Sequence, residues 1–103
     1  MQLKHYPIQR LKEELLTSVK AEVGENPFRL FFFGSRVKGS ENERADIDVG
    51  FLSDKPLDSA VKWKIRDRIE EIPNLYKIDF VDFGNVDVQF RILAMQNTEL
   101  IYG

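Results

Sequence analysis

Two aspartates separated by a single residue stand in an otherwise apolar stretch, Asp46-Ile47-Asp48-Val49. Side chains alternate between the two faces of a strand, so we expect both carboxylates on the same face. Two carboxylates this close repel each other and are costly to bury unless a cation neutralises them. Oxygen ligands of this kind suit Mg²⁺, which completes its shell with water and substrate phosphates. The pair therefore predicts a metal site, although these two residues alone also fit a solvated sheet edge.

A Gly-Ser pair, Gly34-Ser35, ends the apolar run 29–33 and precedes the aspartates by a spacer of about ten residues. Glycine lets the backbone approach a ligand closely, and free N–H groups at a helix start attract phosphate, to which the Ser35 hydroxyl adds a donor. Arg36 and Lys38 follow in the same turn and could bind phosphate oxygens, but each also fits a plain surface position. A Gly-Ser pair by itself is usually only a turn, so its weight here comes from the aspartates that follow.

A third carboxylate is available on a later strand, in the phrase Ile78-Asp79-Phe80-Val81-Asp82-Phe83. Asp79 and Asp82 are three residues apart and face opposite sides of a regular strand, so only one of them can join Asp46 and Asp48. Three carboxylates converging from neighbouring strands would hold two metal ions, as nucleotidyl-transfer sites do.

Together these motifs resemble the nucleotidyltransferases of the DNA polymerase β superfamily. The signature of that superfamily is a hydrophobic residue, Gly-Ser, a spacer of about ten residues, then Asp-hydrophobic-Asp-hydrophobic, with a third carboxylate on a later strand. The matching segments are Phe33-Gly34-Ser35, Asp46-Ile47-Asp48-Val49 and Asp79. The segment from Gly34 to Ser40 is similar to the GSRARG version of the motif, which is typical of the minimal nucleotidyltransferases of bacteria and archaea.

The resemblance covers nearly the whole chain and implies a mixed β-sheet of about four strands with helices packed on it. It implies that Asp46, Asp48 and Asp79 are catalytic and bind two Mg²⁺ ions, with Mn²⁺ as the alternative metal, and that Asp82 is only a strand-end carboxylate. It also implies that Gly34, Ser35 and Arg36 bind the nucleotide phosphates. Minimal members often pair with a small all-helical HEPN protein, and some are antitoxins that transfer adenylyl groups from ATP to that partner.

The elements that must position these residues alternate between helix and strand, which indicates a layered α/β (α+β) domain. Apolar residues at helical spacing, with Gly24 as a stop, predict the first helix, and Asp58 is a candidate N-cap for another. The Pro73-Asn74 pair predicts its end. The predicted helices span residues 8–23, a short segment from 35, 58–72 and 86–97, and the predicted strands span 29–33, 47–52, 75–83 and 99–102, the last at a sheet edge.

Length and composition narrow the classes of function. The chain has 103 residues, so we expect one domain over 1–103. It contains no cysteine and a single histidine, His5, which excludes thiolate chemistry and zinc sites built on Cys or on several His. The net charge of −2 comes with no dense basic stripe, which makes nucleic acid an unexpected partner. The sequence shows neither a signal peptide nor a membrane span, so we expect a cytoplasmic protein.

Helix 58–72 carries residues whose place is open. Trp63 lies off its apolar face and fits either the margin of the core or a surface for a partner. The charged residues around it, Arg66 among them, are expected to form a solvated helix face.

Three functions are compatible with these features. The first is an enzyme that transfers a nucleoside monophosphate, AMP from ATP in particular, to a hydroxyl group on a HEPN-type partner. The second is a non-catalytic antitoxin that neutralises a helical partner by contact, alone or in an oligomer. The third, a polymerase-like enzyme acting on DNA or RNA, is the weakest, because the chain shows no thumb-like domain and no basic channel.

Overall fold

A four-stranded mixed sheet forms the centre of the molecule. The computed structural model describes residues 1–37 and 46–103. The strands are β1 (Arg29–Phe33), β2 (Ile47–Leu52), β3 (Ile78–Asp82) and β4 (Thr98–Tyr102), in the spatial order β3-β2-β1-β4. β1 pairs antiparallel with β2 and β4, whereas β2 and β3 are parallel. The predicted mixed four-stranded sheet is therefore confirmed, with β4 at an edge.

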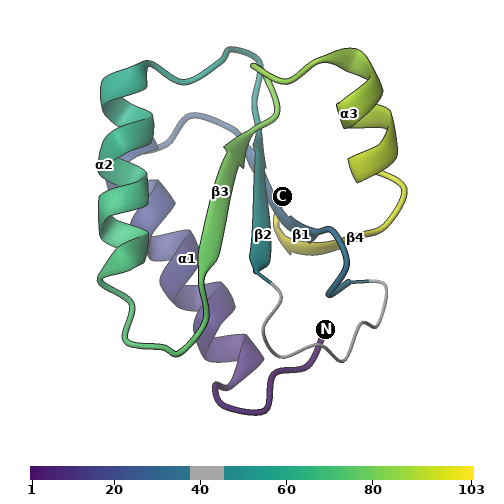
Figure 1. Cartoon of the computed structure of the whole chain (residues 1–103). Helices are drawn as coiled ribbons and strands as arrows, with labels where there is room; N and C mark the ends of the chain where they lie inside the picture. Colours follow the sequence, from purple (N-terminus) through teal and green to yellow (C-terminus); the bar gives the residue numbers. More distant parts are fainter. Residues whose placement is uncertain (38–45) are drawn as a thin grey trace.

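One face of the sheet is covered by α1 (Ile8–Val23) and α2 (Ser59–Glu70), as Figure 1 shows. α1 buries Leu11, Leu15 and Val19, and α2 buries Ile65 and Ile69, as their helical spacing predicts. These side chains pack on the strand residues that point the same way, which include Leu30, Phe32, Ile47, Val49, Phe51 and Phe80. α2 also provides the crossover that two consecutive parallel strands require.

The opposite face carries a smaller aromatic cluster of Phe31, Phe33 and Phe83. Phe83 packs edge-on against Phe31 and Phe33, with ring centroids 5.0 Å apart in both pairs. α3 (Val88–Ala94) leans on this cluster through Phe90 but buries none of its residues. Among the described elements, α3 is the helix on this side of the sheet, whereas two helices cover the other side (Figure 1).

Several predicted elements are shorter in the structure. The strand predicted over 75–83 begins only at Ile78, because the side chain of Asn74 accepts a hydrogen bond from the backbone N–H of Tyr76 (2.7 Å) and holds the chain in a turn. α3 begins one residue after Asp87, whose carboxylate caps it by accepting a hydrogen bond from the N–H of Phe90. α2 has Asp58 at its N-cap position, without a side-chain capping bond, and ends at Glu70 rather than Ile72.

The exposure of Trp63 decides between the two places predicted for it. Trp63 is 69% exposed, which excludes the margin of the core as its place. In the ranges 1–37 and 46–103, none of the helices has both the length and the apolar character needed to cross a membrane.

Candidate active site

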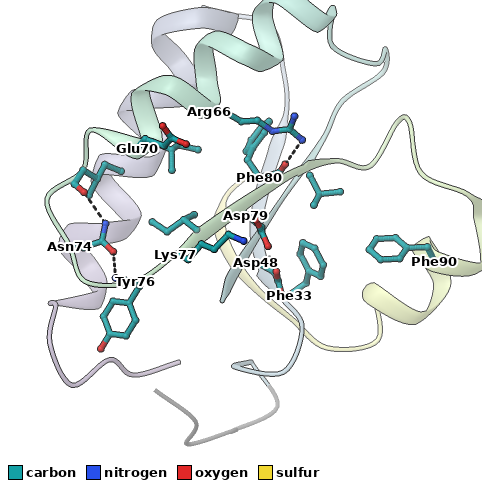
Figure 2. A pocket seen from close by; sticks show the side chains of 14 residues that line it. Phe33, Asp48, Arg66, Glu70, Asn74, Tyr76, Lys77, Asp79, Phe80 and Phe90 are labelled. Atoms are coloured by element: carbon teal, nitrogen blue, oxygen red, sulfur yellow. Dashed lines mark hydrogen bonds between the residues drawn. The ribbon is translucent and has the colours of Figure 1, made fainter. Parts of the chain in front are cut away.

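Asp48 and Asp79 are neighbours across the parallel pair of strands. The register aligns Asp48 of β2 with Asp79 of β3. Because Ile47 and Val49 point into the helix-covered core, Asp48 points to the other face, and Asp79 shares that orientation. Figure 2 shows the two carboxylates close together beside Phe33. The structure thus brings together two of the three carboxylates predicted from the sequence.

Gly34 lies directly against the carboxylate of Asp48. A Cβ atom built on residue 34 would overlap Oδ2 of Asp48. The backbone φ angle of +87° is also one that residues other than glycine rarely adopt. β1 ends at Phe33, whose pairing partner is Asp48, so the turn that follows β1 begins beside this carboxylate. The Gly-Ser turn and the aspartate motif are therefore parts of one site.

The negative charges of the site act on one another. Burial, followed by the charges of Asp79 and Asp46, raises the pKa of the Asp48 carboxyl to about 6. A raised pKa of this origin means that the charged form of Asp48 has too little compensation from its protein surroundings. A cation bound here would supply that compensation, and neighbouring carboxylate oxygens are the ligands that Mg²⁺ prefers.

Asp46 precedes β2 and faces a cation of the protein itself. Its Oδ2 atom lies 3.8 Å from Nζ of Lys77. Among residues 1–37 and 46–103, no three or more His, Cys, Asp and Glu side chains are grouped so that they could hold a metal ion. The sequence predicted a cluster of three carboxylates, whereas the structure shows a neighbouring pair with Asp46 turned towards a lysine.

In the turn after β1, the predicted phosphate-binding residues differ in exposure: Ser35 is exposed and Arg36 is buried. Ser35 is exposed in a turn closed by a hydrogen bond from the N–H of Val37 to the carbonyl of Gly34 (3.2 Å). Arg36 is only 4% exposed, and its guanidinium lies 4.8 Å from the centre of the Tyr76 ring, a cation–π contact. These residues form a turn rather than the predicted short helix, whose remainder lies outside the described residues, as does Lys38.

Asp82 has a different environment from Asp79. Its buried carboxylate accepts hydrogen bonds from the N–H of Leu57 (2.7 Å), the N–H of Gly84 (2.9 Å) and the side-chain amide of Asn85 (3.3 Å). Asp82 therefore fastens the loop that leads into α2 to the end of β3, in agreement with the strand-end place predicted for it.

A cavity of about 580 Å³ runs along β3 and opens onto the Asp48–Asp79 pair. Figure 2 shows Lys77 and Phe90 on either side of the two carboxylates. Arg66 of α2 also lines the cavity and donates a hydrogen bond to the carbonyl of Phe80 (3.0 Å), so it does more than form a solvated helix face. Lys77 was a signal available in the sequence, because it stands two residues before Asp79 in the strand predicted over 75–83, a spacing that places both side chains on one face.

A small mixed sheet with paired aspartates against a Gly-Ser turn is the arrangement expected of a nucleotidyltransferase. The family model described as polymerase beta, nucleotidyltransferase matches residues 14–103, and the chain belongs to this family.

Within this family, the chain is similar to a protein with a named activity. The chain is 28% identical over 83 residues to the probable protein adenylyltransferase MntA of Haemophilus influenzae, an alignment that covers 79% of this chain and 73% of MntA.

Two solved structures share the fold. One is the tri-AMPylated HEPN toxin of Shewanella oneidensis in complex with MNT antitoxin, at a TM-score of 0.69 and 16% identity, covering 92% of this chain and 71% of the other. The second is a toxin–antitoxin structure with AMP-PNP, at a TM-score of 0.72 and 16% identity, covering 89% of this chain and 73% of the other.

Proposed function

We propose that the protein transfers AMP from ATP to a hydroxyl group on a HEPN-type helical partner protein. The observation that carries the proposal is the register of β2 and β3, which sets Asp48 beside Asp79 and against Gly34 in a member of a nucleotidyltransferase family. The kinds of relatives support the choice of donor and acceptor: a probable protein adenylyltransferase, a HEPN toxin carrying AMP groups, and a complex with AMP-PNP.

The three aspartates are proposed to hold two Mg²⁺ ions, or Mn²⁺ in their place, and the donor set of hard carboxylate oxygens suits both. Such ions, when bound, neutralise the charge that develops on the phosphates and activate an attacking hydroxyl. Asp48 and Asp79 are already adjacent, and the charge of Asp46 already acts on Asp48, so in this assignment Asp46 exchanges its ion pair with Lys77 for a metal ion.

The remaining steps belong to residues around the pair. The Gly34-Ser35 turn offers backbone N–H groups and a hydroxyl to the β and γ phosphates, and Arg36, a residue of the same turn stacked on Tyr76, adds a positive charge. The acceptor oxygen attacks the α-phosphorus and forms the new P–O bond, while the bond to the bridging oxygen of pyrophosphate breaks. Asp79 accepts the proton that the hydroxyl releases. The acceptor approaches through the cavity that opens onto Asp48 and Asp79, since α1 and α2 cover the other face of the sheet.

The decisive experiment uses ATP labelled at the α-phosphate, with Mg²⁺, the purified protein and lysate of the source cells. Asp48→Asn removes a proposed metal ligand worth several kcal/mol, so labelling of the acceptor should fall by at least about 1,000-fold. Asp67→Asn, the same change at an exposed site on α2, is the matched control and should label like the wild type. Equal labelling by Asp48→Asn, with circular dichroism like that of the wild type, would overturn the proposal.

A contact-only antitoxin is a second candidate, because large apolar side chains are exposed on α3 and β4. Val88, Ile92 and Leu93 of α3 and Leu100 of β4 are each more than half exposed, which is unusual for a surface without a partner. The double variant Asp46→Asn, Asp48→Asn separates the two functions. If cells expressing a HEPN partner survive with this variant as with the wild type, neutralisation proceeds by contact; if they die, it requires chemistry. In either case we expect the protein to act in the cytoplasm.

A further inference from the structure

Lys77 lies at this site but is not part of the family motifs. Its backbone is fixed, because its carbonyl accepts a hydrogen bond from the N–H of Ile47 (2.9 Å) where β2 and β3 begin to pair. Its side chain is 74% exposed and reaches Asp46 with Nζ 3.8 Å from Oδ2. Figure 2 shows the ammonium group extending over β3 towards Asp79 and Asp48. Because the Lys77 backbone is fixed and its side chain is exposed, the ammonium group can move within the space around all three carboxylates.

Two cations from the described part of the chain line the cavity, and they differ in what they contact. Of the described residues that line the cavity, Lys77 and Arg66 are the cationic ones. Arg66 is held by its hydrogen bond to the carbonyl of Phe80, on the α2 side of β3. Of these two cations, Lys77 is thus the one that pairs with an aspartate of the site, Asp46, and its side chain extends towards Asp79 in Figure 2.

The contact between Lys77 and Asp46 is easily exchanged. At 3.8 Å it is an ion pair beyond hydrogen-bonding distance, and exposed pairs of this kind contribute little to stability. A lysine ammonium is also a mobile point charge that binds phosphate as readily as carboxylate. The geometry therefore favours a cation that can change partners when the charge of the site changes.

We propose that Lys77 exchanges partners during the reaction cycle: it neutralises Asp46 while the site is empty of nucleotide, and it moves to the triphosphate of the nucleotide once divalent metal ions occupy the carboxylates. The inference rests on the proposed function, of which it specifies one residue. In this scheme Lys77 competes with metal for Asp46 before the nucleotide binds and cooperates with metal afterwards.

Two effects of opposite sign follow for Lys77→Met, which keeps an unbranched side chain one atom shorter than lysine and removes its charge. Without nucleotide, the variant should bind Mn²⁺ more tightly than the wild type, by up to about fivefold, since the competing cation is gone. With Mg²⁺ present, it should bind the non-cleavable ATP analogue with a methylene between the α and β phosphates about tenfold more weakly, since a charged phosphate contact is lost. A purely structural role would shift both affinities in the same direction.

The test titrates nucleotide-free protein with Mn²⁺ by electron paramagnetic resonance and measures binding of the analogue by calorimetry. Lys64→Met on the exposed side of α2 is the matched control and should match the wild type in both, while Lys77→Arg should retain nucleotide binding. Weaker Mn²⁺ binding by Lys77→Met, unchanged binding of the analogue, or a wild type that binds no Mn²⁺ would each overturn the inference. Opposite shifts in a protein that labels no acceptor would support the role of Lys77 while contradicting the proposed transfer.

Discussion

The two faces of the sheet use the same strands for opposite purposes. Towards α1 and α2 the strands present Phe32, Val49 and Phe80, which are buried almost completely. Towards the open face the same strands present Asp48 and Asp79, next to a cavity and an exposed helix. β2 shows the contrast residue by residue, because Ile47, Val49 and Phe51 alternate with Asp48 and Gly50. The helix-covered face supplies the stability that lets the open face hold unfavourable charges.

The largest expected effect concerns the closed face. Phe32→Ala empties a fully buried position and should lower the free energy of unfolding by about 3–5 kcal/mol, a large part of the stability of so small a domain. Phe90→Ala on the open face, where the ring is 41% exposed, should lower it by only about 1 kcal/mol. Urea unfolding followed by circular dichroism compares the two, and equal losses would contradict the division between the faces.

The two aspartates of β3 provide the next comparison. Asp82→Ala deprives the N–H groups of Leu57 and Gly84 of a charged acceptor and should lower the free energy of unfolding by about 1.5–3 kcal/mol. Asp79→Asn should leave stability nearly unchanged and abolish transfer of labelled AMP. A variant pair in which Asp82→Ala loses transfer while remaining fully stable would reverse the assignment of the third carboxylate.

Gly34→Ala tests the contact between the turn and Asp48. The added methyl group strains a backbone at φ +87° and displaces the Asp48 carboxylate, so we expect a loss of about 1–2 kcal/mol in stability. Transfer should fall far more than this loss explains, measured at a temperature where the variant is fully folded. Gly24→Ala is a useful control, because Gly24 also has a positive φ but nothing stands near its added Cβ.

The smallest expected effect is a gain of stability, in Asp48→Asn, whereas the variants above lose stability or leave it nearly unchanged. The pKa of Asp48 is raised from 3.8 to about 6 in the folded protein, so the folded state holds the proton more tightly and ionisation destabilises it as the pH rises through this window. Asp48→Asn should therefore stabilise the metal-free protein at about pH 7.5. Because the group is half-exposed, solvent screening reduces the gain to about 1 kcal/mol.

The pH dependence checks the cause of that gain. Unfolding in the presence of a chelator at about pH 7.5 and about pH 3.5 should show the gain at the higher pH and only a small remainder at the lower, where Asp48 is protonated in the folded state and mostly protonated in the unfolded state. A gain of equal size at both pH values would mean that packing of the amide, rather than removal of charge, stabilises the variant.

Much of the fold and part of the site could be predicted from the sequence. Periodic apolar residues located α1, α2 and the strands, and alternation along β3 required Asp79 and Asp82 to face different sides. The register that aligns Asp48 with Asp79 could not be read from the chain, because it depends on how α2 crosses over the sheet. The stacking of Arg36 on Tyr76 and the contact of Asp46 with Lys77 are likewise tertiary contacts between distant segments, so the sequence can place each residue near the site but cannot name its partner.

The parallel pairing of β2 with β3 also has a consequence for the order of events during folding. β1 and β2 follow each other along the chain and pair antiparallel, whereas the whole of α2 separates β2 from β3, so the pairing of β2 with β3 is a non-local step of folding. Asp48 and Asp79 meet only at that non-local step. A partly unfolded chain in which β3 is not paired with β2 therefore has no assembled pair of carboxylates, so the candidate site exists only in the completed sheet.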